Sequence, residues 1–254
     1  PDAIVYATPK ASLLASIAGA VTRVPVRIYE LWGLRLETAH GFGRAVLSAL
    51  ERLTSRLSTV ILPNSRSLLA RYEHLDLPCG TPLQMLGEGS SHGINIERFS
   101  ADADITRADA ETQRWLDEDP SVTVVGFVGR LHPDKGVDTL LDALRACSAR
   151  GTAVRALIVG RDEGAGLGGA TGELAGEVSV HLTGSVADPR PYFAAMDILV
   201  LPSLREGFPN VVLEAASMGL PSVVSDGTGV VDSVVHGATG LVCPVGDADA
   251  FADA

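Results

Sequence analysis

The chain has 254 residues, 46% of them hydrophobic, a formal net charge of −11 and three well-separated cysteines, Cys79, Cys147 and Cys243. This is the composition of an ordinary globular protein. The negative charge argues against nucleic acid as a partner, because binding a nucleic-acid backbone needs clustered cations. No stretch approaches the roughly 18 uncharged apolar residues of a membrane helix. The cysteines form no C-x-x-C pair, so they indicate neither a disulfide framework nor a zinc site and fit a reducing cytoplasm best.

Short runs rich in β-branched and apolar residues alternate with helical stretches along nearly the whole chain. This alternation is typical of βα units around a parallel sheet. Parallel sheets of this kind bind ligands at the carboxyl ends of their strands, so the loops that follow the strands are where a site is expected. The predicted strands are 3–7, 24–29, 59–62, 83–86, 122–128, 155–159, 178–182, 198–201, 222–224 and 240–242.

A stretch rich in Gly, Ser and Asp, GEGSSHGINIERFSADADIT, separates two parts of unequal charge. Residues 1–99 carry ten Lys and Arg against eight Asp and Glu, whereas residues 100–254 carry ten against twenty-three, which gives +2 and −13. This asymmetry indicates two bodies with different surfaces. We predict two α/β domains, residues 1–99 including a hinge and residues 100–254. Because the chain opens close to a strand and stops where a helix has only begun, we expect a fragment of a longer protein.

The stretch VVGFVGRLHPDKGVDTLLDAL combines a buried strand, a tight turn at Gly129 and a helix that begins near Lys135. Arg130 and Lys135 thus flank a helix N-terminus, where the helix dipole disfavours cations by a few tenths to about 1 kcal/mol. An anion between them would remove this conflict, because backbone N–H groups, dipole and both side chains would point at one phosphate. The alternative is that both cations are solvated, with Lys135 paired to Asp134 or Asp138.

In the stretch REGFPNVVLEAASMGLPSVVS, Glu214 is the only formal charge between Glu206 and Asp226, amid small and apolar residues. Pro209 suits the first turn of a helix, Gly207 and Asn210 suit the turn before it, and a helix that is apolar on nearly all sides is a buried one. A buried carboxylate needs donors, which ligand hydroxyls could supply. Glu206 lies eight residues earlier, so the two carboxylates bracket a helix N-terminus suited to a polyhydroxyl compound. An arginine or backbone groups could equally satisfy Glu214.

Together these stretches resemble the C-terminal half of retaining GT-B glycosyltransferases, in particular glycosyltransferase family four of the group 1 type. The pairing of G-R-x4-K-G with E-x7-E is far more specific than either motif alone, and the similarity extends through LIVG, HLTGSV, YFAAMDILVLPS and HGATGLVCPVGD. The first half, with ATPKASLLA, VPVRIYELWGL and GINIERF, resembles the latter part of the family's acceptor-side domain more loosely. The resemblance implies two Rossmann-like domains, the N-terminal one incomplete.

The resemblance also implies the transfer of a sugar, with retention at the anomeric carbon, from a UDP- or GDP-linked donor to a saccharide or lipid-linked acceptor in polysaccharide or glycolipid biosynthesis. No cofactor and no dedicated metal are implied, since fixed cations replace the metal, and peripheral contact with the inner face of the membrane is a further expectation. Arg130 and Lys135, after Gly129, match the cations that hold the donor diphosphate; Glu214 matches the ribose-binding carboxylate; Glu206, with Gly207, Phe208, Pro209 and Asn210, matches the donor-sugar side. A sugar-nucleotide epimerase of the same architecture and a non-catalytic sugar-nucleotide-binding module stay open as alternatives.

Weaker signals remain. Gly164, Gly166 and Gly169 satisfy the dinucleotide fingerprint G-x-G-x-x-G, but no firm helix start follows them. Three D-x-D pairs fall in expected linkers or helix starts and are interpreted as solvated surface. Lys10, at another strand-to-helix junction, is a candidate for phosphates, and Trp32 in LWGLRL for a lipid-linked acceptor, but a surface role for Lys10 and packing at a domain edge for Trp32 explain them as well.

Overall fold

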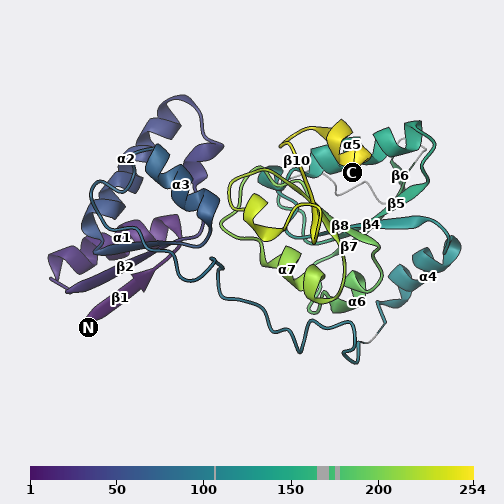
Figure 1. Ribbon diagram of the computed structural model, residues 1–254, viewed down its shortest axis with the longest axis horizontal. Helices are drawn as coiled ribbons and strands as arrows, with labels where there is room; N and C mark the ends of the chain where they lie inside the picture. The colour runs from purple at the N-terminus through teal and green to yellow at the C-terminus, as the bar shows by residue number, and fades with distance from the viewer. Residues whose placement is uncertain (106, 165–171, 175–177) are drawn as a thin grey trace. The chain divides into compact units, whose positions relative to one another are not determined.

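The computed structural model describes residues 1–105, 107–164, 172–174 and 178–254. The chain forms two compact units, both visible in Figure 1. The expected α/β class with parallel sheets is confirmed. Unit 1 comprises Pro1–Gly93, Arg205–Pro209 and Thr228–Asp232, and unit 2 comprises Ile94–Leu204, Asn210–Gly227 and Ser233–Ala254.

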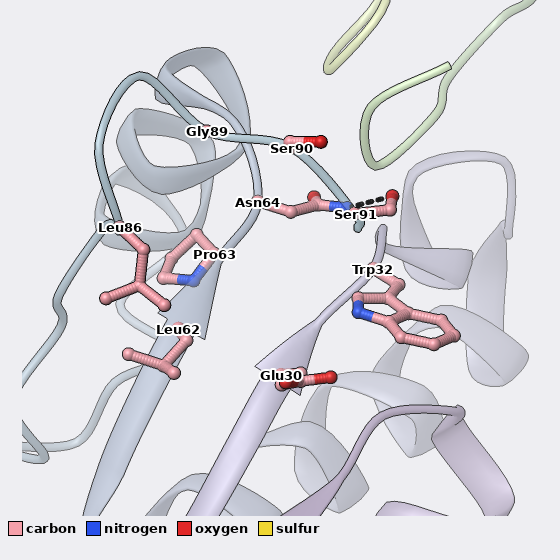
Figure 2. Close-up of a pocket in the computed structure, with 9 residues that line it drawn as sticks. All are labelled: Glu30, Trp32, Leu62, Pro63, Asn64, Leu86, Gly89, Ser90 and Ser91. Atoms are coloured by element: carbon pink, nitrogen blue, oxygen red, sulfur yellow. Dashed lines mark hydrogen bonds between the residues drawn. The ribbon is translucent and has the colours of Figure 1, made fainter. Parts of the chain in front are cut away.

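Unit 1 contains a three-stranded parallel sheet in the order β1-β2-β3. Helices carry the chain between consecutive strands, as parallel pairing requires. At the carboxyl ends of β2 and β3 the unit leaves an open cavity (Figure 2). The elements are β1 (Ala3–Tyr6), α1 (Pro9–Val21), β2 (Val26–Leu31), the 3-10 helix η1 (Arg35–Glu37), α2 (Gly41–Leu57), β3 (Val60–Pro63) and α3 (Arg66–His74).

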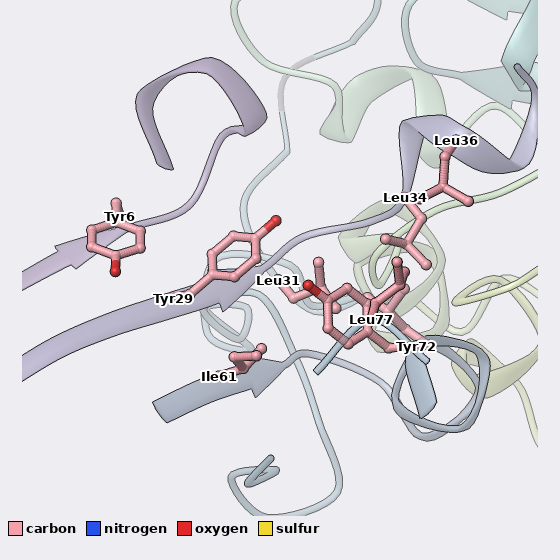
Figure 3. Packing of buried hydrophobic residues seen from close by; sticks show 9 residues of the cluster. Tyr6, Tyr29, Leu31, Leu34, Leu36, Ile61, Tyr72 and Leu77 are labelled. Carbon is pink, nitrogen blue, oxygen red and sulfur yellow. The ribbon is translucent and has the colours of Figure 1, made fainter. Parts of the chain in front are cut away.

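The core of unit 1 lies between the sheet and its helices (Figure 3). Tyr29 of β2 and Tyr72 of α3 are fully buried, and both hydroxyls donate to Oε1 of Glu51 in α2, that of Tyr72 at 3.3 Å. Burial raises the pKa of Glu51. The two phenols thus supply the donors that a carboxylate needs away from water.

Unit 2 contains a seven-stranded sheet in the order β10-β9-β8-β4-β5-β7-β6, parallel except for the pair β6–β7. Helices follow most of its strands. Its elements are α4 (Ala110–Glu118), β4 (Thr123–Val128), η2 (Pro133–Lys135), α5 (Val137–Ala149), β5 (Val154–Val159), β6 (Gly172–Leu174), β7 (Val178–Gly184), α6 (Arg190–Phe193), β8 (Ile198–Leu201), α7 (Asn210–Ser217), β9 (Ser222–Ser225), β10 (Gly240–Cys243) and α8 (Ala248–Asp253); η3 (Val231–Ser233) spans the boundary between the two units in sequence.

Nine of the ten predicted strands are observed, with ends shifted by at most two residues. The strand predicted over 83–86 is wrong: Leu83 forms only an isolated bridge with Ile61, and Leu86 is 70% exposed. Gly87, at φ 58°, then turns the chain away from β3. The sequence missed β6, and Gly166 and Gly169 of the dinucleotide fingerprint lie outside the described residues.

Candidate functional site

The strand order of unit 2 creates a switch point between β4 and β8. From β4 the chain proceeds to β5 and β7 on one side, and only afterwards to β8, β9 and β10 on the other. β4 and β8 pair in parallel, so their carboxyl ends meet at one edge of the sheet. In open parallel sheets ligands bind outside the carboxyl ends of the strands at such a point. The topology therefore selects the loops that follow these two strands.

Gly129 and Arg130 directly follow β4 at this edge. The backbone of Gly129 lies tightly against the end of β5: its N–H donates to the Val159 carbonyl at 2.9 Å, and a β-carbon on Gly160 would lie 1.7 Å from the Gly129 carbonyl oxygen. The first residue of the loop is thereby fixed, and Arg130 extends from it with a side chain that is 65% exposed. The position is accessible to a ligand.

Arg130 has an acidic partner, Glu163, that was not predicted from the sequence. Nη1 of Arg130 lies 3.0 Å from Oε2 of Glu163, whose other oxygen lies 2.5 Å from Nη2 of Arg161. Hydrogen bonds from Arg161 and Arg130 hold the pKa of Glu163 below its ordinary value. Because β4 and β5 are neighbours, the acid in the loop after β5 was the signal that could have revealed this pair.

Lys135 is the last residue of η2 and immediately precedes Gly136 and α5, as predicted for a helix start. Its loop is fastened to the segment after β8, since the Leu204 N–H donates to the Asp134 carbonyl at 2.8 Å. Gly136 adopts φ 67°, and a β-carbon there would lie 2.0 Å from the Pro202 carbonyl oxygen. The structure therefore brings the loop of Lys135 to the carboxyl end of β8.

The helix that carries Glu214 is α7, which begins at Asn210, directly after Pro209. Val212 and Ala215 are buried, whereas Ala216 is exposed and Glu214 is half-buried. The expectation of a helix buried nearly all round is therefore wrong: one face packs against β8 and β9, whereas Ala216 meets solvent and the remaining residues are half-buried.

Glu206, Gly207, Phe208 and Pro209 belong to unit 1, so the nine predicted site residues divide into four in unit 1 and five in unit 2. Within unit 1, the Glu206 N–H donates to the Thr228 carbonyl at 2.7 Å. Gly207 and Pro209 are buried, and Glu206 and Phe208 are half-buried. The binding roles of all nine residues remain predictions.

The cavity of unit 1 is a second candidate site (Figure 2). The space inside it is about 350 Å³, a volume that includes open solvent. Trp32 is the one lining residue that the sequence also offered as a candidate for acceptor binding. The lining comprises Glu30, Trp32, Leu62, Pro63, Asn64, Leu86, Gly89, Ser90 and Ser91.

No cluster of three or more His, Cys, Asp or Glu side chains within the described ranges is arranged to hold a metal ion. Likewise, none of the helices in the part of the chain that the structure describes combines the length and apolarity needed to cross a membrane.

Comparison with known proteins gives consistent matches. A family model described as glycosyl transferases group 1 matches residues 122–254. The capsular polysaccharide biosynthesis glycosyltransferase CapM of Staphylococcus aureus is 34% identical over 253 residues, covering 97% of this chain and 64% of the relative. The D-inositol 3-phosphate glycosyltransferase of Corynebacterium urealyticum is 34% identical over 172 residues, covering 64% of this chain and 40% of the relative. The chain thus spans less than two thirds of either relative.

Among solved structures, Anabaena Alr3699/HepE in complex with UDP-glucose superposes with a TM-score of 0.76 at 24% identity, covering 99% of this chain and 67% of that one. At this identity the likeness concerns the fold. It confirms the expected GT-B architecture.

Proposed function

The chain belongs to the glycosyl transferases group 1 family, and from this premise we propose that the protein transfers a sugar from a nucleoside-diphosphate sugar to a saccharide or lipid-linked acceptor. Polysaccharide or glycolipid biosynthesis is the proposed setting. The observation that carries the proposal is the position of Arg130 and Lys135. Both lie in the segment that follows β4 and approaches the end of β8, and the sheet's switch point falls between these two strands. Two cations at the place where parallel sheets bind ligands suit a diphosphate.

The proposed chemistry is leaving-group stabilisation. As the bond between the anomeric carbon and the donor phosphate oxygen breaks, its electron pair stays on that oxygen; the acceptor hydroxyl oxygen bonds to the anomeric carbon, and its proton passes to the departing phosphate. Arg130 and Lys135, with the N-terminal amides of α5, would bind that developing charge, a task for which fixed cations and dipoles are effective. Because these groups are built into the protein, we propose a metal-independent transfer, and we propose retention at the anomeric carbon from the resemblance to retaining glycosyltransferases.

Glu163 gives the donor a competitor. In the structure its carboxylate is ion-paired with the Arg130 guanidinium, so a bound diphosphate would replace Glu163 as the anionic partner of that guanidinium. An exposed ion pair of this kind contributes little to stability, so a phosphate that accepts two hydrogen bonds from the guanidinium can displace it.

We assign the remaining predicted residues to the rest of the donor. Glu214, half-buried on α7, would accept hydrogen bonds from ribose hydroxyls, and Glu206 with Gly207, Phe208, Pro209 and Asn210 would serve the donor sugar. We also propose action in the cytoplasm with peripheral contact at the inner membrane face. The free thiols of all three cysteines suit that reducing compartment.

The test combines donor binding with product analysis. A nucleoside-diphosphate sugar at 100 times its Kd should stabilise the protein by about 2.7 kcal/mol, and a screen of UDP- and GDP-linked sugars by thermal shift identifies the donor. Lys135→Ala and Arg130→Ala should each weaken donor binding by roughly tenfold or more, the loss expected for one charged hydrogen bond.

Arg145→Ala is the matched control for Arg130→Ala. Arg145 is likewise an exposed arginine ion-paired to an acid, Asp142, at 2.5 Å, but it lies on α5. Unchanged donor affinity in both site variants would refute the assignment. NMR of the donor incubated alone separates transfer from epimerisation, because only an epimerase changes the sugar without an acceptor.

A further inference from the structure

The cavity of unit 1 joins the exposed ends of two neighbouring strands. Glu30 of β2 lies opposite Leu62 of β3 in the sheet register, and Trp32 follows two residues after Glu30. Side chains alternate between the faces of a strand. Tyr29 and Leu31 are buried in the core, so Glu30 and Trp32 share the opposite face and both border the cavity in Figure 2.

Glu30 places a negative charge at the wall of this cavity. Glu30 is half-buried, and within the described ranges its carboxylate forms no hydrogen bond or ion pair. The nine residues of the lining contain no lysine, arginine or histidine. A partly desolvated carboxylate is stabilised by hydrogen-bond donors, and a ligand with hydroxyl groups is one source of them.

Trp32 supplies a flat apolar surface beside that carboxylate. Trp32 is 46% exposed, although tryptophan is usually well buried. Leu86, 70% exposed, extends the apolar wall on the other side of the cavity in Figure 2. A large aromatic face next to a polar group is the combination that recognises a ring with one apolar face and polar edges.

Contacts within the protein hold the rim of the cavity at Asn64 and Ser91. The side-chain amide of Asn64 lies 2.9 Å from the Ser91 hydroxyl, and with its oxygen assigned toward Ser91 its nitrogen donates to the Leu31 carbonyl at 3.1 Å. A β-carbon on Gly89 would lie 2.5 Å from the Asn64 carbonyl oxygen, so the rim backbone is pressed against that residue. These contacts fix the backbone and the amide at this rim.

We propose that this cavity binds one neutral pyranose ring of the acceptor, stacked on Trp32 with its hydroxyls donating to Glu30, and that it rejects sugars carrying a carboxylate or phosphate. The proposal rests on the proposed function, since it names the acceptor's chemical class. Like charges in close proximity repel, and the lining offers no cation that would offset the repulsion between Glu30 and an anionic substituent.

Intrinsic fluorescence gives a test that needs no transfer activity. The chain has two tryptophans, and Trp115 is buried against His181 at a ring distance of 5.4 Å, so acrylamide quenches mainly Trp32. Methyl glucoside, mannoside and galactoside should be titrated against acrylamide quenching of the full chain. At least one should protect Trp32 with a Kd of about millimolar order, the range for a ligand of a dozen non-hydrogen atoms.

Acidic analogues and a charge variant test the specificity. Methyl glucuronide and glucose 6-phosphate should bind at least about tenfold more weakly than the best neutral sugar. Glu30→Gln should weaken neutral-sugar binding about tenfold and bring the ratio between neutral and acidic sugars toward one. Glu73→Gln, the same change on an exposed carboxylate of α3, should leave both quantities unchanged.

The outcomes separate this proposal from the proposed function. If no neutral sugar protects Trp32 at about 100 mM while nucleoside diphosphates still raise the melting temperature, the cavity proposal is overturned and the function stands. Tighter binding of the acidic sugars would also overturn it. Protection of Trp32 without any stabilisation by nucleotides would support the cavity and reject the nucleotide-dependent function.

Discussion

Gly136 is the residue on which the placement of Lys135 most depends. Its φ of 67° is a conformation that favours glycine, and its α-carbon faces the Pro202 carbonyl so closely that a β-carbon would lie 2.0 Å from that oxygen. The atom in the way is backbone at the end of β8, which cannot rotate aside. The loop of Lys135 and the chain after β8 therefore hold each other in place.

We expect Gly136→Ala to lower the free energy of unfolding by about 3 kcal/mol or more, because a left-handed conformation for alanine costs roughly 1–2 kcal/mol and the clash adds to it. Urea denaturation measures the loss, and donor titration should show weaker binding as the Lys135 loop shifts. Gly151→Ala is the matched control: Gly151 also has a positive φ, 81°, at the other end of α5, but a β-carbon there meets no atom within 4 Å. Equal losses in the two variants would contradict the close approach.

Helix α4 is fastened to unit 2 at both of its ends. At the N-terminus Asp109 accepts from the backbone N–H groups of Glu111 and Thr112, from the Thr112 hydroxyl at 2.7 Å and from the Tyr192 hydroxyl at 2.9 Å. The Thr112 oxygen lies 2.9 Å from Nε2 of His181 in β7. At the C-terminus Arg155 of β5 donates to two carbonyls of the last turn. These bonds satisfy helix ends that otherwise lack partners.

The N-terminal fastening should make stability depend on pH. Hydrogen bonds from the Thr112 N–H and hydroxyl hold the pKa of Asp109 well below its ordinary value. A depressed carboxyl pKa contributes stability that is present above the unfolded pKa of about 3.9 and is lost as the pH falls toward the folded pKa.

Asp109→Asn isolates this charge, because asparagine also caps helices well. We expect it to lower the free energy of unfolding by about 0.5 kcal/mol at pH 7, a value kept small because the residue is exposed. The difference from the parent protein should shrink as the pH falls from about 5 to 2. Asp104→Asn, on an exposed carboxylate of the linker, should show no such trend, and a pH-independent difference for Asp109→Asn would refute the account.

Sequence periodicity predicted the strands well because each is short, apolar and followed by a loop signal. It failed where neighbours decide the outcome. The run at 83–86 has strand-like residues, yet only Leu83 finds a strand to pair with. The burial of α7 was overestimated because its small apolar residues can also face solvent, as Ala216 does.

The arrangement of a site across a sheet is predictable only in part. Motif positions after strands placed Arg130 and Lys135 at the carboxyl edge, because that follows from local order alone. The pairing of Arg130 with Glu163 depends on β5 being the neighbour of β4, and the shared face of Glu30 and Trp32 depends on the exact end of β2. Strand order and strand register are set by tertiary packing, so neither contact could be predicted from the sequence.

The two units also carry separate internal reporters. Trp32 lies in unit 1 and Trp115 in unit 2, and they are the two tryptophans of the chain. Trp32→Phe therefore leaves fluorescence from unit 2, and Trp115→Phe leaves fluorescence from unit 1. A ligand that binds only the native form of one unit raises the stability of that unit by mass action.

A nucleoside diphosphate without its sugar should stabilise unit 2 selectively, because the residues proposed to hold phosphate and ribose, Arg130, Lys135 and Glu214, all belong to that unit. At 100 times its Kd, the ligand should raise the unfolding free energy reported by Trp115 in Trp32→Phe by about 2.7 kcal/mol. The urea transition reported by Trp32 in Trp115→Phe should move much less. Each variant is compared with and without ligand, so a lower baseline stability of Trp115→Phe does not affect the comparison. Equal shifts in the two variants would mean either one cooperative transition for the whole chain or phosphate contacts from unit 1, and both contradict this prediction.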